Sequence, residues 1–70
     1  MSDMDPEDDL AGYGPVLTPQ QVAEVLQMNQ QHLVRLMREG RFPAFRIQGV
    51  WRVKRSALLA VMNGTWKPDH

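Results

Sequence analysis

The apolar residues change their spacing at Pro43, and this change constrains the fold more than any other feature of the sequence. Before Pro43 they recur every three or four positions, which is the period of an amphipathic helix. Over residues 45–54 they alternate with polar residues, as in half-buried strands, and the helical period then returns over 55–63. The chain is therefore predicted to form helices, a β-hairpin and a closing helix, in that order.

Two short helices are expected before Pro43. Thr18, Pro19 and Gln21 are typical of a helix start, in which threonine caps the helix, proline takes its first position and glutamine closes a capping box. This helix is predicted over about 19–26, and Asn29 can cap a second helix. Two helices separated by three residues have the spacing of a helix-turn-helix, which any small helical hairpin would share.

The alternating segment predicts a two-stranded hairpin. Pairing Ile47 with Trp51 keeps the apolar residues on one face and makes 48–50 a three-residue loop, in which the glycine can adopt a positive φ. In this register Arg46 and Arg52 face each other across the strand pair. Opposed like charges are unfavourable, so either an anion lies over this face or both side chains fan out into water.

The closing helix is expected from Arg55 or Ser56 to Asn63, with Gly64 as its stop, just as Gly40 stops the second helix. Together these patterns predict one small core. Its members are the apolar residues turned inward, namely Val22, Val25, Leu26, Leu33, Leu36, Met37, Phe42, Phe45, Ile47, Trp51, Val53, Leu58, Val61 and Met62.

The size and composition exclude several classes of protein. Seventy residues leave room for a single domain, and the absence of cysteine excludes a disulfide framework and a classical zinc finger. No apolar run reaches the roughly 18 residues of a membrane span, and the acidic start is unlike a signal peptide. We therefore expect a cytoplasmic protein. No metal or other cofactor is expected, because the two histidines are isolated from each other.

The formal net charge of zero divides unevenly along the chain. Residues 1–15 contain five acidic residues and no basic one, whereas 16–68 contain all eight Lys and Arg residues against two glutamates. We expect a disordered acidic tail over 1–15, an ordered domain over 16–64 and a C-terminal tail over 65–70. The basic domain suggests nucleic acid as partner. The acidic tail either competes with DNA for the basic face or only keeps the protein soluble.

Three segments occur in the order and spacing of a known family: LTPQQVAEVL over 17–26, RLMREGRFPAFRI over 35–47 and VWRV over 50–53. With them the chain resembles the excisionase-type winged helix-turn-helix family, which is related to the MerR DNA-binding domain. The resemblance covers residues 17 to about 62. It implies a mainly α fold with a small β-hairpin, in which the second helix enters the major groove of DNA and the wing reaches the backbone or the adjacent minor groove.

Small free-standing members of that family include excisionases, or recombination directionality factors, which bend DNA and assist an integrase without catalysing the reaction. The resemblance thus implies double-stranded DNA as partner, cooperative self-association on repeated sites and an integrase as a further partner. A small MerR-like transcription regulator is the alternative, followed by a terminase small subunit and a protein-interaction adaptor. We expect no enzyme, because Glu24, Glu39 and Asp69 are the only acids outside 1–15 and offer no catalytic pair.

The sequence departs from the family pattern at three places. Gln27 stands where the turn usually has glycine, so it adopts either a conformation tolerable to a side chain or a left-handed one that costs about 1 kcal/mol. The second helix opens with NQQ over 29–31 in place of the common Ser-Arg-Arg, and Val34 replaces the usual aromatic residue. These changes lower the expected non-specific phosphate affinity of this helix.

One face of the second helix is expected to carry recognition. A rotation of about 100° per residue places Gln31, Arg35 and Arg38 opposite its apolar face. Glutamine can pair with adenine and arginine with guanine, so we assign Gln31 and Arg35 to base edges and Arg38 to a phosphate. Gln30 and Val34 flank this stripe, and the valine suits a thymine methyl group. An ordinary solvated helix face would show the same pattern.

The predicted wing supplies further cations. Arg46 and Arg52, with Lys54 nearby, are candidates for phosphate or minor-groove contacts, because narrow minor grooves attract arginine. The amides at the start of the first helix, beneath Thr18, are a second candidate for a phosphate, although capping is the main role expected for that threonine.

Overall fold

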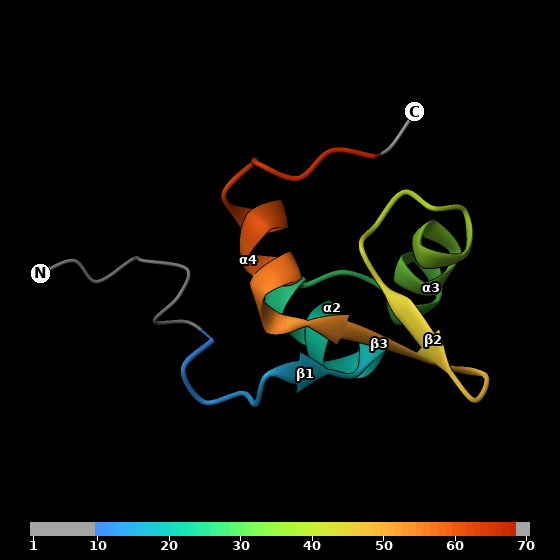
Figure 1. Cartoon of the computed structure of the whole chain (residues 1–70), viewed down its shortest axis with the longest axis horizontal. Coiled ribbons are helices and arrows are strands. Elements are labelled where there is room, and N and C mark those ends of the chain that lie inside the picture. Colours follow the sequence, from blue (N-terminus) through green and yellow to red (C-terminus); the bar gives the residue numbers. More distant parts are fainter. Residues whose placement is uncertain (1–9, 69–70) are drawn as a thin grey trace, which may run out of the picture.

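The order of elements predicted from the change at Pro43 is the order in the fold. The computed structural model describes residues 10–68 (Figure 1). Its elements are β1 (Val16–Leu17), α2 (Pro19–Leu26), α3 (Gln30–Arg38), β2 (Phe45–Ile47), β3 (Val50–Lys54) and α4 (Arg55–Met62). Within the described residues, three helices accompany a small antiparallel sheet of order β1-β3-β2, which confirms the predicted winged helix-turn-helix class.

The two helix starts form as predicted. At α2 the Gln21 N–H donates to Thr18 Oγ1 at 3.1 Å, and the Thr18 N–H donates back to Gln21 Oε1 at 3.0 Å, which completes the capping box. At α3 the His32 N–H donates to Asn29 Oδ1 at 3.1 Å. Each cap supplies a partner to an amide that the helix itself leaves unpaired, and so fixes the two helices on either side of the turn.

The turn between α2 and α3 keeps the conformation of a glycine although it contains none. Gln27 has φ 55° and ψ 49°, in the left-handed region. This conformation lets the Met28 N–H donate to the Ala23 carbonyl at 3.0 Å, so that the end of α2 is capped. Of the two outcomes expected for Gln27, the protein adopts the strained one.

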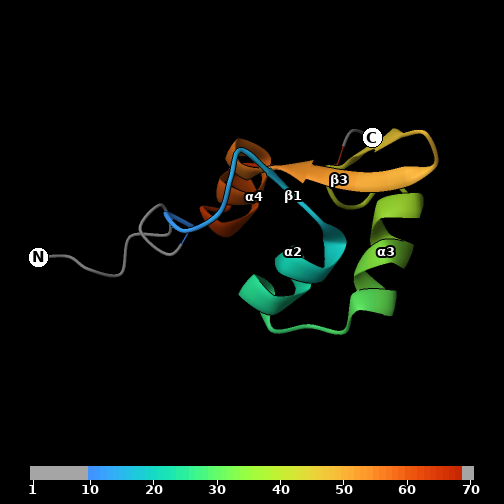
Figure 2. The ribbon, with the colours of Figure 1, turned by 90° about the horizontal axis from the view of Figure 1, so that it is seen from below.

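Strand β1 was not expected. The ordered domain was predicted to begin at residue 16 without a strand there, but Val16 pairs with Lys54 and Leu17 with Val53, so that β3 becomes the central strand. Leu17 and Val53 are both completely buried. Figure 2 shows α2 and α3 on the same side of β3, and this side of the sheet is therefore its core face.

The predicted register of the hairpin is wrong by one pair. Arg46 pairs with Trp51, and Ile47 pairs with Val50, so the loop has two residues instead of three. The reason is Gln48, which adopts a positive φ of 54° ahead of Gly49 at 80°, as a type I′ turn requires. Side chains alternate between the faces of a strand. The face opposite the core, which we call the outer face, therefore carries Val16, Phe45, Ile47, Val50, Arg52 and Lys54.

The core agrees with the prediction except at its edges. Completely or nearly buried are Leu10, Leu17, Val22, Ala23, Leu33, Met37, Phe42, Val53 and Leu58. Ile47, expected in the core, is 57% exposed because the register turns it to the outer face. Leu10, Leu17 and Ala23 are core residues that the periodicity did not mark. Phe45, also expected in the core, is half-buried on the outer face, where the register pairs it with Arg52. The other predicted members are half-buried around this cluster.

The described chain is packed from Leu10 onward, whereas order was expected to begin at Val16. The Arg55 guanidinium donates to the carbonyls of Tyr13 at 2.8 Å and of Leu10 at 3.5 Å, and the Arg55 N–H donates to the Pro15 carbonyl at 2.8 Å. Residues 10–15 thus lie against the start of α4, and Leu10 is completely buried. The acidic residues of the predicted tail lie in 1–9, outside the described residues.

The segment after α4 also returns to the domain. The N–H groups of Thr65 and Trp66 donate to the Ala60 carbonyl at 2.9 and 3.2 Å, and Gly64 reverses the chain with φ 77°. Trp66 is half-buried. Residues 64–66 therefore cap α4 instead of trailing away from it.

The strain at Gln27 can be tested by removing its side chain. We expect Gln27→Gly to raise the free energy of unfolding by about 0.5–1 kcal/mol, since glycine relieves a left-handed penalty of ~1–2 kcal/mol but loses more backbone entropy on folding. Urea denaturation followed by circular dichroism measures the change. Gln31→Gly is the matched control in a right-handed helix, and there we expect a loss of roughly 0.5–1 kcal/mol. A loss in both variants would contradict the strain.

Candidate nucleic-acid interface

The polar face predicted on α3 is present and open to solvent. Gln31, Arg35 and Arg38 are all exposed, while Leu33 and Met37 are buried on the opposite side of the helix. Gln30 is also exposed, and Val34 is half-buried at the margin of the polar face. The helix contains no acidic residue, and its last turn holds both arginines, where the helix dipole favours positive charge. The face therefore presents amide and guanidinium groups side by side.

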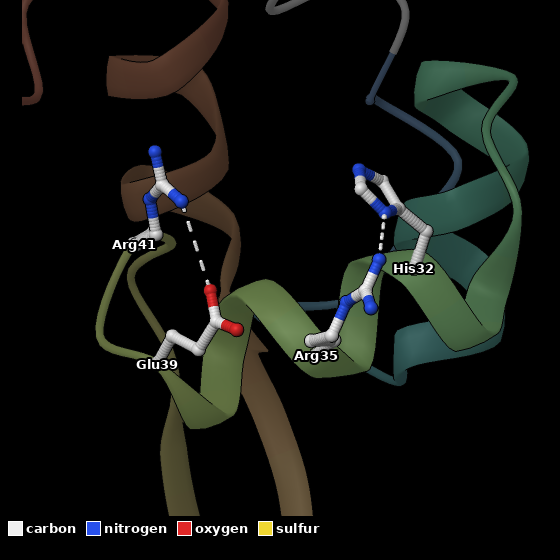
Figure 3. Close-up of polar contacts among 4 residues, drawn as sticks. All are labelled: His32, Arg35, Glu39 and Arg41. Carbon is white, nitrogen blue, oxygen red and sulfur yellow. Dashed lines mark hydrogen bonds and ion pairs between the residues drawn. The ribbon is translucent and has the colours of Figure 1, made fainter.

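His32 belongs to this face and was not among the predicted site residues. It is exposed, and the Arg35 Nη2 lies 3.5 Å from its Nδ1 (Figure 3). The distance is at the long limit of a hydrogen bond, so the contact orients the guanidinium only weakly. The signal in the sequence is the spacing of three residues between His32 and Arg35, which makes them neighbours on a helix.

Arg41 is a second cation that the prediction omitted. It follows α3 and lies 3.7 Å from the Glu39 carboxylate, with both side chains largely exposed (Figure 3). An exposed pair of this kind contributes about 0–1 kcal/mol to stability, so Arg41 can exchange Glu39 for another anionic partner at little cost. Its guanidinium extends the positive charge of α3 beyond Arg38.

The cations of the wing, which were predicted to act together, lie on opposite faces of the hairpin. Arg46 pairs with Trp51 and lies over its indole ring, with the guanidinium carbon 5.2 Å from the ring centroid. This places Arg46 on the core face of the hairpin, the side on which α3 lies. Arg52 and Lys54 are on the outer face. The expectation that Arg46 and Arg52 face each other is wrong, and Arg46 alone of the three shares a side with α3.

The start of α2 offers little to a phosphate. Pro19 has no N–H, the Gln21 N–H already donates to Thr18 Oγ1, and the Val22 N–H donates to the Thr18 carbonyl at 3.0 Å. Only the Gln20 amide of this turn is without a partner among the described residues. The geometry thus uses Thr18 for capping.

Comparison with known protein families identifies the family to which this arrangement of helices and wing belongs. Residues 16–65 match a family described as helix-turn-helix domain. The chain belongs to that family. In this helix-turn-helix, α2 is the first helix, 27–29 form the turn, α3 is the recognition helix and β2–β3 form the wing. The match implies DNA as a partner, and such domains are typically non-enzymatic.

Two further comparisons add no relatives to this helix-turn-helix. No curated protein and no solved structure matches the chain. Over residues 10–68, no helix is long and apolar enough to cross a membrane, and no group of three metal-ligating side chains comes together.

Proposed function

We propose that the protein binds double-stranded DNA with sequence preference, with α3 in the major groove and the wing against the backbone or the adjacent minor groove. The observation that carries this proposal is the uninterrupted polar face of α3, on which Gln31, Arg35 and Arg38 are exposed with no acidic neighbour on the helix. A solvated face of a small protein usually mixes both signs of charge. Within α3 itself the charge is of one sign and is opposite to that of the phosphate backbone, and Glu39, the acid that follows the helix, pairs with Arg41.

Within this face we assign roles by side-chain chemistry. Gln31 and Arg35 lie one turn apart and carry the groups that pair with adenine and guanine edges, so they read bases. Arg38 is nearer the end of the helix and contacts a phosphate. Gln30 and Val34 flank the bases, with the valine against a thymine methyl group. Arg41, whose ion pair with Glu39 is weak, adds a second phosphate contact at the same end.

On the wing we propose Arg46 as the DNA contact. It lies on the side of the sheet where α3 lies, and its stacking on Trp51 restricts the guanidinium before DNA arrives. Such stacking is worth about 0.5–1 kcal/mol at an exposed site, enough to favour one orientation. Arg52 and Lys54, which the sequence also offered for this role, lie on the outer face. Reaching the same duplex would require them to extend around the wing.

The biological role that we propose is that of an excisionase, an accessory factor that binds repeated sites, bends the DNA and assists an integrase in excising a mobile element. The three-segment resemblance to excisionases supports it, and the helix-turn-helix match over 16–65 supports only the DNA binding that this role requires. A single module makes few base contacts, so useful affinity requires several copies side by side on the DNA. Adjacent copies along a bent duplex are what such a role requires.

An excision assay tests this role. Where an integrase gene lies beside this one, a plasmid carrying the two attachment sites of that element is incubated with its integrase, with and without the protein. We expect recombination only when the protein is present, and a bend in the bound sites, which is measured by a gel mobility that changes with the position of the site along fragments of equal length. If recombination proceeds equally without it, and a promoter fusion changes its output instead, the protein is a transcription regulator that uses the same surface.

The role of Arg35 is tested on a site selected from a random DNA library. We expect Arg35→Ala to weaken binding to this site by about 1–3 kcal/mol and to relax discrimination at one base pair, because the bidentate contact to one guanine is lost. Fluorescence anisotropy with the selected duplex and its single-pair variants measures both effects. Equal weakening on a scrambled duplex would mean that Arg35 contacts a phosphate.

The role of Arg46 is tested by salt dependence, with Arg52 as the matched control on the opposite face of the same hairpin. Each phosphate contact contributes about 0.9 to the slope of log K against log salt. We expect Arg46→Ala to lower the magnitude of the slope by about one on any duplex, and Arg52→Ala to leave it unchanged. If the two variants behave alike, the wing acts through its net charge and not through a positioned contact.

A further inference from the structure

The outer face of the sheet is the most apolar exposed surface among the described residues. The three large apolar side chains with high exposure all lie on it: Val16 at 45%, Ile47 at 57% and Val50 at 45%. Both α2 and α3 lie on the other side of β3 (Figure 2), so neither helix covers this face. Apolar side chains that gather on one surface, instead of being scattered singly, mark a place where another chain segment binds.

The outer face is grooved along its length. One hollow lies near the wing tip, between Val16, Phe45, Ile47, Val50 and Arg52. A second lies beside α4 and is lined by Pro15, Val16, Lys54, Arg55, Ser56 and Leu59. Val16 borders both hollows, so they adjoin at β1, and we refer to the two together as the groove. Its lining residues follow β3 from Lys54 to Val50, which is the path that an extended chain on the sheet would take.

The charge of the groove restricts what can occupy it. Arg52 and Lys54 stand on the outer face beside the exposed apolar side chains, and the residues that line both hollows include no acid. Arg52 is half-buried, with its guanidinium donating to the Trp51 carbonyl at 2.7 Å, which holds it close to the sheet. A fitting occupant is extended and combines carboxylates with flexible apolar side chains.

The chain itself contains such a segment. Residues 1–9, MSDMDPEDD, hold five acidic residues and two methionines, and methionine adapts to irregular apolar surfaces. They join the domain at Leu10, whose carbonyl accepts from the guanidinium of Arg55, the residue that follows Lys54. Nine extended residues span about 30 Å. The outer face along β3, from Lys54 to Val50, needs only about 14 Å.

We propose that residues 1–9 bind in the groove of the outer face of the same molecule. Their carboxylates pair with Arg52 and Lys54, and their methionines cover Val16, Ile47 and Val50. Exposed ion pairs of this kind are individually weak, but the tether at Leu10 keeps the segment at a high effective concentration. The segment thereby shields the apolar face from other copies and partners, while the polar face of α3 stays open. This proposal does not depend on DNA binding.

Paramagnetic relaxation gives a direct test. The chain has no cysteine, so Ser2→Cys creates a single attachment point for a nitroxide spin label. In the labelled, ¹⁵N-enriched full chain we expect loss of amide peak intensity at Val16, Ile47 and Val50, and none at Gln31 and Arg38 on α3. Loss centred on α3, or loss nowhere in the domain, would overturn the proposal.

Two charge variants show whether the contact is specific. Replacing the five acids of residues 1–9 with their amides leaves the domain untouched, and we expect it to restore the outer-face intensities. Arg52→Glu should restore them as well, whereas Arg46→Glu, the same change on the other face of the hairpin, should not. If Arg52→Glu and Arg46→Glu have equal effects, net charge alone attracts the segment and the groove has no part in its binding.

A mixing experiment separates binding within one molecule from binding between copies. Spin-labelled chain without ¹⁵N is added to unlabelled, ¹⁵N-enriched chain. We expect no loss of intensity in the enriched chain, because each groove is occupied by its own residues 1–9. Loss at the outer face in this mixture would overturn the proposal in favour of exchange between copies. Since no DNA is present, failure here leaves the proposed DNA-binding function untouched.

Discussion

Strand β3 is the element on which the rest of this domain depends. It pairs with β1 on one side and β2 on the other, packs against α2 and continues directly into α4. Val53 is the centre of these contacts, because it is completely buried and pairs with the equally buried Leu17. The other elements are short. The position of the wing relative to the recognition helix is therefore determined by the register in which β3 pairs with β1 and β2.

The register of β3 decides which charges act together. A loop longer by one residue would place Arg46 opposite Arg52 and leave both arginines on one surface. The two-residue turn, made possible by the positive φ of Gln48, instead gives Arg46 an indole to stack on and turns Arg52 to the other side. One backbone torsion angle thus divides the wing into a side shared with α3 and a side that is apolar and cationic.

What could be predicted from the sequence was local. The caps at Thr18 and Asn29 and the stop at Gly40 involve residues three or four positions apart, and all of them formed as predicted. What could not be predicted was non-local or strained. Strand β1 exists through pairing with residues far along the chain, the burial of Leu10 accompanies the contact of its carbonyl with Arg55, and no pattern marks Gln48 for the left-handed region. The polar face of α3 followed from helical period alone, whereas the division of the wing cations did not.

The small size of the domain accounts for the character of its two surfaces. A chain of this length has too little mass to bury both sides of its sheet, so the core takes one side and the other stays open. The recognition helix cannot cover that open side, because its own exposed face is polar and lies across the core from it. An apolar surface that no helix covers favours association with other copies. The covering that we propose for residues 1–9, whose acids suit Arg52 and Lys54 and not a DNA duplex, would keep this surface apart from the one that we propose for DNA.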